Sequence, residues 1–253
     1  MSKILVTGAL GLVDARAIRF LRECKNRYGV VAVRVTPAFA PAVSQADLDY
    51  TLSQLDCVDQ VLSLDTPWPN HLPTVAFPAE LNWQAWKDLQ TPIPEDDPQP
   101  VALSIDELLD SRPSPLVLLS GCFDLIHAGH IHLIELATRY GSMPIAAALT
   151  TQAIRTQPKN TNRRRPLWSM ANRLAVLEAL RSKPRVLFFN GPDCLDLIER
   201  LRPDVWVKEQ RDRGRSIVEQ ESRLVEALGG RSVWEDGVRF QNSSTTIAQS
   251  VTN

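Results

Sequence analysis

Cysteine and histidine are scarce in this sequence, and neither sign of charge is in excess. The cysteines, Cys24, Cys57, Cys122 and Cys194, lie far apart with no CxxC pair, which argues against a disulfide framework or a cysteine-rich zinc site. A net charge of −1 gives no general reason to bind nucleic acid or an anionic membrane. No apolar run approaches the roughly 20 residues of a spanning helix, and no signal peptide is expected. We therefore expect a soluble, cytoplasmic protein with no nucleic-acid or membrane partner.

The chain is long enough for two domains, and proline marks the boundary between them. Its 253 residues, 44% of them hydrophobic, suit one large domain or two of about 100–150 residues. Prolines cluster between positions 90 and 115, which indicates a linker. Within this linker, Ser104 and Glu107 predict a capping box and one short helix. The expected division is 1–89, a linker at 90–115, and 116–253.

Both halves open with a short aliphatic run that ends in glycine. Residues 3–8 and 116–121 predict buried parallel strands, and each is followed by a turn and a helical apolar pattern. Second strands are expected at 30–35 and 144–150. Identical residues recur 113 positions apart in the same order, as at Gly8 and Gly121. We interpret the chain as an α/β protein with Rossmann-like parallel sheets in two related halves, the first a degenerate repeat. The alternative is that any two βα units look this similar.

Histidines gather at the start of the second half. Three of the four, His127, His130 and His132, fall within six positions, where a predicted strand enters a helix. Backbone N–H groups at a helix N-terminus favour anions, and Gly129 lets a phosphate approach the backbone. His127 and His130 would flank one point in space. Two imidazole donors there suit the charge that develops at phosphorus during an in-line displacement.

Other interpretations of these and neighbouring residues remain open. The histidines would be ordinary core residues or zinc ligands, although His130 and His132 point to different helix faces. A basic stretch at 155–173 suits a polyphosphate or is a solvated loop. Hydroxyl residues at 243–246 would cap a helix and also offer donors to a phosphate.

The segment 121–134, GCFDLIHAGHIHLI, resembles the signature of the HxGH nucleotidyltransferases, the cytidylyltransferase-like superfamily. Residues 116–253 look most like the heptose-1-phosphate adenylyltransferase domain of bacterial ADP-heptose synthase, through RRRPLWSMANRLAVLEAL (163–180) and SSTTIAQSV (243–251). The resemblance implies transfer of a nucleoside monophosphate from an NTP, with ATP favoured over CTP, to a phosphorylated sugar or polyol with release of pyrophosphate. Mg²⁺ would bridge the NTP phosphates with few protein ligands, so no metal-binding residue is assigned.

Site residues follow from the resemblance, position by position. The expected catalytic residues are His127, His130 and Lys208. The expected nucleotide-binding residues are Gly121, Cys122, Phe123, Asp124, Gly129, Arg165, Arg173, Ser244, Thr245 and Thr246. After the lysine the family commonly continues with Gly-Gly-Asp-Tyr, whereas this chain reads Glu-Gln-Arg-Asp at 209–212. The acceptor-side loop of this chain therefore departs from the family pattern.

The first half lacks the residues that would handle phosphate. In the alignment of the two halves, Asp14 stands opposite His127 and Arg16 opposite Gly129. We expect residues 1–89 to be a packing or dimerisation partner, as in a homodimer, or a wall of the acceptor pocket.

Two other functions stay open. The segment TGALGLVD (7–14) is also similar to the opening of NAD(P)-binding epimerases and reductases, but Asp14 stands where that fingerprint needs glycine. The changed loop at 209–212 leaves room for a nucleotide-binding pseudoenzyme or sensor.

Overall fold

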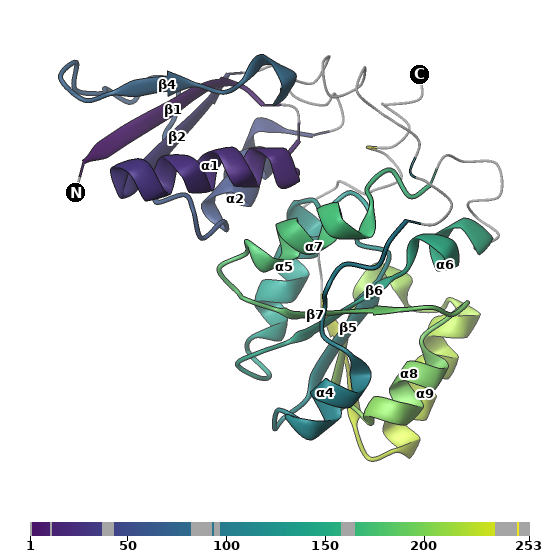
Figure 1. The fold of residues 1–253 in the computed structure, drawn as a ribbon. Helices are drawn as coiled ribbons and strands as arrows, with labels where there is room; N and C mark the ends of the chain where they lie inside the picture. The colour runs from purple at the N-terminus through teal and green to yellow at the C-terminus, as the bar shows by residue number, and fades with distance from the viewer. Residues whose placement is uncertain are drawn as a thin grey trace.

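The described part of the chain contains two parallel β-sheets, each with helices packed against it (Figure 1). The computed structural model describes residues 2–10, 12–36, 43–81, 93, 97–157, 165–235 and 247. Every strand pair in both sheets is parallel. The α/β class and the Rossmann-like sheets expected from the sequence are thereby confirmed.

The first sheet has four strands in the order β3-β2-β1-β4. Its strands are β1 (Lys3–Ala9), β2 (Val30–Thr36), β3 (Gln60–Val61) and β4 (Thr74–Ala76). Its helices are α1 (Ala15–Tyr28), α2 (Gln45–Ser53) and the 3₁₀ turn η1 (Ala79–Leu81). Successive residues Ile4, Leu5 and Val6 are all buried, because a central parallel strand is covered on both faces.

The second sheet has five strands in the order β7-β6-β5-β8-β9. Its strands are β5 (Val117–Gly121), β6 (Ile145–Leu149), β7 (Arg185–Phe189), β8 (Val205–Glu209) and β9 (Arg231–Glu235). Its helical segments are α4 (Ile105–Asp110), α5 (Ala128–Ala137), α6 (Thr151–Thr156), α7 (Met170–Glu178), α8 (Leu195–Leu201), η3 (Gln210–Asp212) and α9 (Ser216–Ala227). No helix within the described ranges is long and apolar enough to cross a membrane.

The strands expected from the sequence form where they were predicted. The aliphatic runs at 3–8 and 116–121 lie in β1 and β5, and the second strands of the two halves are β2 and β6. The predicted capping box opens α4, where the Ser104 hydroxyl accepts the Glu107 N–H at 3.2 Å and the Glu107 carboxylate accepts the Ser104 N–H at 2.8 Å.

The order of the first sheet, β3-β2-β1-β4, matches the order β7-β6-β5-β8 in the second. Asp14 caps α1 at the place where His127 caps α5. The Asp14 carboxylate accepts the N–H groups of Arg16 and Ala17 at 2.9 and 3.0 Å, and the Arg16 guanidinium pairs with it at 2.7 Å. The Asp14 carboxylate therefore occupies the N-terminus of α1, where the pyrophosphate of a dinucleotide would bind, and this argues against dinucleotide binding by the first half. The common strand order agrees with a duplication, which stays a prediction.

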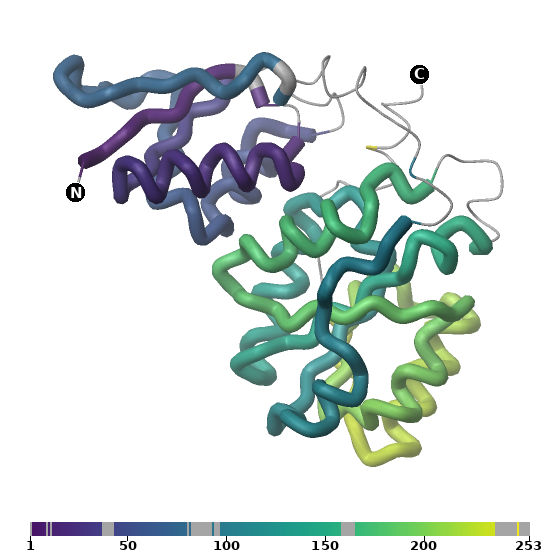
Figure 2. The backbone as a smooth tube through the Cα atoms, viewed as in Figure 1, coloured from purple at the N-terminus to yellow at the C-terminus, as the bar shows by residue number. Residues whose placement is uncertain are grey.

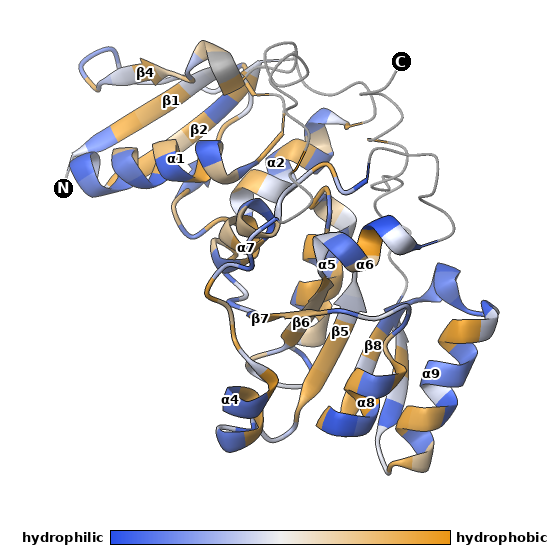
Figure 3. Cartoon of the chain, turned by 45° about the vertical axis from the view of Figure 1, so that its right-hand side comes forward, coloured by the Kyte–Doolittle hydropathy of each residue, from blue (hydrophilic) through white to orange (hydrophobic). Residues whose placement is uncertain are grey.

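The second sheet separates two layers of apolar side chains. Along β5, Val117 and Leu119 face the layer that holds α5 and α7. The alternate residues Leu116 and Leu118 face α8 and α9, as the two-residue period of a strand requires. Figure 3 shows hydrophobic colour along β5, whereas α8 and α9 carry both hydrophilic and hydrophobic colour. Both faces are thus covered, as in the first sheet.

The two halves are joined along a seam where α1 and α2 lie beside α5 and α7 (Figure 2). The backbones of 54–56 and 179–181 pair through two hydrogen bonds of 2.8 Å. The Ala15 N–H donates to the Asn172 side chain at 2.7 Å, and one apolar cluster runs from the first sheet into α5 and α7. The first half therefore supports the helix that carries the histidines.

Candidate active site

A cavity of about 560 Å³ lies where β5, β6, β7 and β8 end, with Gly121, Leu149, Phe189 and Glu209 in its wall. Small-molecule sites typically enclose about 300–1,000 Å³, and open α/β sheets place them at the carboxyl ends of their strands. The expected site residues that line this cavity are Gly121, Cys122, Phe123, His127, His130, Arg165 and Lys208.

His127 precedes α5 as its N-cap residue and lines the cavity. Its backbone is extended, and its Nδ1 accepts the Gly129 N–H at 3.2 Å. Because Nδ1 accepts, the proton of the neutral ring is on Nε2. In the described part of the chain this buried Nε2 has no hydrogen-bond partner. His127 therefore offers an unused N–H donor in the wall of the pocket.

The His130 ring packs against the rings of His127 and Phe123, tilted by 36° and 48° to them. The centroids of the two imidazoles are 4.0 Å apart, and the Phe123 ring is 5.3 Å from His130. Phe123 has a φ of 45°, a left-handed conformation that costs a non-glycine residue about 1–2 kcal/mol. A strained turn that packs an aromatic ring against His130 limits the positions the imidazole can take.

Both histidines are neutral at pH 7. Burial is the main cause that holds the pKa of His127 well below its ordinary value, and His130 and Arg211 add to it. Burial, followed by the charges of Arg211 and Arg165, lowers the pKa of His130 to about 3. The two rings therefore act as neutral hydrogen-bonding groups in the empty pocket.

This depression predicts a loss of stability in acid. Below pH 6.5 the unfolded chain binds a proton at each histidine, whereas the folded protein, with its lower histidine pKa, does not. The free energy of unfolding is therefore fully retained above pH 6.5 and decreases as the pH falls towards the folded-state pKa. At pH 5 we expect a loss of up to about 2 kcal/mol per histidine. Urea denaturation at pH 7 and pH 5 measures it, with the double variant His127→Gln/His130→Gln as control. Equal losses in both proteins would contradict the prediction.

Asp124 lies beneath the histidine turn with no exposed surface. Its carboxylate accepts the N–H groups of Leu167 and Trp168 at 2.8 and 2.9 Å and pairs with Arg165 at 2.5 Å. Burial raises the pKa of Asp124, and Arg165 with the two amides opposes that rise. Asp124 therefore holds the segment that brings Arg165 to the cavity, and it does not line the cavity itself.

Arg173 is fully buried and also lies outside the cavity wall. Its guanidinium donates to the carbonyls of Cys122 at 2.9 Å and Leu149 at 2.5 Å, and it lies 5.2 Å from the ring of Phe188. Arg173, which we expected to bind the nucleotide, instead links the carboxyl ends of β5 and β6. Gly129 is buried behind His127, while Ser244, Thr245 and Thr246 lie outside the described residues.

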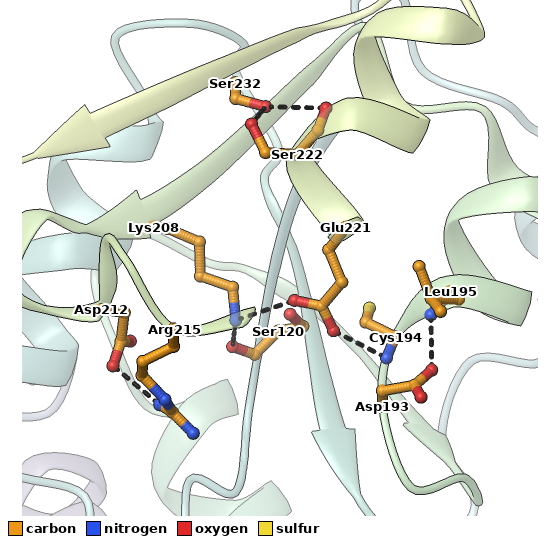
Figure 4. Close-up of polar contacts among 10 residues, drawn as sticks. All are labelled: Ser120, Asp193, Cys194, Leu195, Lys208, Asp212, Arg215, Glu221, Ser222 and Ser232. Carbon is orange, nitrogen blue, oxygen red and sulfur yellow. Dashed lines mark hydrogen bonds and ion pairs between the residues drawn. The ribbon is translucent and has the colours of Figure 1, made fainter. Parts of the chain in front are cut away.

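Lys208 extends from β8 and lines the same cavity (Figure 4). Its ammonium donates to the Ser120 carbonyl at 3.2 Å and lies 3.9 Å from the Glu221 carboxylate. In the same wall, Arg211 pairs with Glu209, and Arg215 pairs with Asp212 at 2.8 Å. This wall therefore alternates acidic and basic groups.

Sequence reasoning placed the loop at 209–212 on the acceptor side, but it named none of its residues as site residues and did not name Arg215 or Glu221. Glu209 is the last residue of β8, and Arg211 and Asp212 lie in η3 directly after that strand. The rule that sites form where parallel strands end would have identified them. Glu221 carries no such signal, because it is one of several acidic residues on a surface helix. In the described ranges, no group of three or more His, Cys, Asp or Glu side chains is placed to hold a metal ion.

Comparisons with known proteins agree with this arrangement. Residues 118–250 match the cytidylyltransferase-like family model, which covers more than half of the chain. The D-beta-D-heptose 1-phosphate adenylyltransferase of Bordetella bronchiseptica is 35% identical over 135 residues, which are 53% of this chain and 80% of that protein. The bifunctional protein HldE of Streptomyces coelicolor is 30% identical over 154 residues, 61% of this chain and 31% of that protein.

The matched part of the chain thus spans about a third of the length of the bifunctional relative. Among solved structures, pantothenate synthetase from Thermus thermophilus shares 15% identity at a TM-score of 0.41, over 61% of this chain and 71% of that chain. At that TM-score the structural match has no bearing on function. The family model, the adenylyltransferase match and the histidine-lined pocket agree with one another. The chain therefore belongs to the cytidylyltransferase-like family of nucleotidyltransferases.

Proposed function

We propose that this protein transfers a nucleoside monophosphate from an NTP to a phosphorylated sugar or polyol and releases pyrophosphate. ATP is the favoured donor and CTP the alternative, because the relative from Bordetella bronchiseptica is named an adenylyltransferase. The observation that carries the proposal is the unused Nε2–H of His127 in a cavity that Lys208 also lines.

In this reaction no covalent bond to the protein forms, because the nucleotidyl group passes directly from the NTP to the acceptor. An oxygen of the acceptor phosphate attacks the α-phosphorus of the NTP, and the bond from that phosphorus to the bridging oxygen breaks. Pyrophosphate leaves with the electron pair. Catalysis then depends on positioning and on donors aimed at the phosphoryl oxygens as charge develops. In this proposal His127 and His130 supply the donors on one side, and Lys208 and Arg165 supply positive charge.

Mg²⁺ is proposed as the companion of the NTP. The described residues hold no cluster of three metal-binding side chains, and the carboxylates of Glu209, Asp212 and Glu221 are already paired with basic groups. The ion would therefore be held by the substrate phosphates, where it neutralises their charge. No step is assigned to a protein-bound metal.

The charged wall supports a polyhydroxylated acceptor. Lys208, Arg211 and Arg215 each have a carboxylate beside them, so this wall offers donors and acceptors together without a large positive excess. Vicinal hydroxyl groups both donate and accept, and they match such a surface. The acceptor phosphate would then lie towards the histidines.

All four cysteines are free thiols, which suits the cytoplasm that we propose as the location of the protein.

Pyrophosphate release tests the proposed function. Each of the four NTPs with Mg²⁺ would be combined with heptose 1-phosphate, glycerol 3-phosphate and phosphoethanolamine, the last as an acceptor without vicinal hydroxyls. We expect release with ATP and one of the two polyhydroxylated acceptors. NTP binding with no release across the panel would indicate a nucleotide-binding protein without turnover, and an absence of NTP binding would overturn the proposal.

A further inference from the structure

Glu221 is a buried carboxylate with two partners from distant parts of the chain. It lies on α9 and is 4% exposed. One oxygen is 3.9 Å from the Lys208 ammonium, and the other accepts the Cys194 N–H at 2.9 Å. Figure 4 shows the side chain reaching from α9 towards both groups. Glu221 therefore links β8, the start of α8 and α9 at a single point of the pocket wall.

The surroundings of Glu221 hold it in place. Ser222, the next residue on α9, donates to the Ser232 hydroxyl of β9 at 2.8 Å, which fixes this turn of the helix against the sheet. The Cys194 amide belongs to the residue that precedes α8, and no side-chain cap is formed there. Burial raises the pKa of Glu221, and the charge of Lys208 is the strongest effect in the opposite direction. A buried carboxylate is costly unless it is paired and hydrogen-bonded, and here it is both.

Lys208 depends on this carboxylate. Its side chain is 13% exposed, and its ammonium lies between the Ser120 carbonyl, the ring of Trp206 at 5.1 Å and Glu221. Glu209, the next residue in the sequence, pairs with Arg211. Glu221 thus supplies the counter-charge for a mostly buried cation whose four-carbon side chain is otherwise flexible.

We propose that Glu221 is a positioning residue that fixes the Lys208 ammonium at the pocket wall, ready for the phosphates of the substrate. This inference rests on the proposed function for the role of Lys208. The contact of 3.9 Å is loose for an ion pair, so the ammonium is oriented but free to engage an anion that enters the cavity. Glu221 itself acts only through Lys208.

Glu221→Gln is the informative variant, because its amide oxygen still accepts the Cys194 N–H while the charge opposite Lys208 is lost. Glu226→Gln, on an exposed position of the same helix, is the matched control. We expect Glu221→Gln to remain folded, with a lower melting temperature because Lys208 loses its counter-charge. It should lower kcat/KM by about tenfold to a hundredfold, the usual effect of losing a group that orients a binding residue. Glu226→Gln should behave as the wild type.

A double-mutant cycle separates positioning from a general structural role. In a Lys208→Met background, adding Glu221→Gln should lower kcat/KM by no more than about twofold, because coupled residues are not additive. Losses that multiply would overturn the inference, as would a fully active Glu221→Gln.

A second measurement does not depend on turnover. Acetylation of Lys208 by acetic anhydride, followed by mass spectrometry with the exposed Lys183 as internal reference, should be several-fold faster in Glu221→Gln. An unchanged rate would overturn the inference even in an active enzyme. If the wild type releases no pyrophosphate but Lys208 is still labelled faster in the variant, the positioning stands and the proposed function fails.

Discussion

Replacing His130 by alanine is expected to lower kcat/KM for nucleotidyl transfer by about 10²–10³-fold, the usual loss when one preorganised donor to a developing charge is removed. The His130 ring lies 4.0 Å from that of His127 and lines the cavity, so its removal takes away one of the two imidazoles that would face phosphorus. Steady-state pyrophosphate release measures the loss, and a thermal melt shows whether the fold persists. The melting temperature should change little.

His132→Ala is the matched control for that variant. His132 lies on the same helix but faces the seam, 3.5 Å from the Tyr50 hydroxyl and 3.9 Å from Glu135, so turnover should stay near the wild-type value. A His130→Ala protein with full activity would refute the role given to the histidines. A similar loss in both variants would point to damage to α5 rather than to lost chemistry.

Replacing Asp124 by alanine is expected to lower the free energy of unfolding by about 3–5 kcal/mol, because it breaks a buried ion pair with Arg165. The change also deprives the N–H groups of Leu167 and Trp168 of their acceptor, and each unsatisfied buried donor adds to the cost. Urea denaturation at pH 7 measures the difference. Asp124→Asn, which keeps an acceptor oxygen, should lose less.

The exposed pair of Arg200 and Asp106 provides the comparison. Arg200→Ala should change the free energy of unfolding by less than about 1 kcal/mol, since exposed ion pairs contribute little. If Asp124→Ala were as stable as Arg200→Ala, the buried pair would not hold the segment that carries Arg165. Activity should fall with stability only for the Asp124 variants.

Local pattern was enough to predict the strands, the first helix turns and the capping box, because each depends on residues a few positions apart. The aliphatic runs predicted β1 and β5, and the histidine-rich turn was expected at the start of a helix, where it lies at α5. The strand order of each sheet has no such local signal, since it depends on which strands meet in space.

Arg173 shows why the rest could not be predicted. An arginine in a basic stretch suggests a solvated or phosphate-binding side chain, yet this one is fully buried because the carbonyls of Cys122 and Leu149 converge on it. Those carbonyls lie 51 and 24 residues away along the chain. Glu221 escaped notice for the same reason, since its partner Cys194 is 27 residues away.

The seam between the halves bears on how the protein unfolds. Because the backbones of 54–56 and 179–181 are hydrogen-bonded to each other and one apolar cluster crosses the boundary, neither sheet can melt without exposing the core of the other. We therefore expect thermal denaturation to be a single cooperative event, and agreement of the calorimetric and van't Hoff enthalpies would verify it. Residues 1–89 would then share one folding equilibrium with the pocket, although none of those that the structure describes lines it.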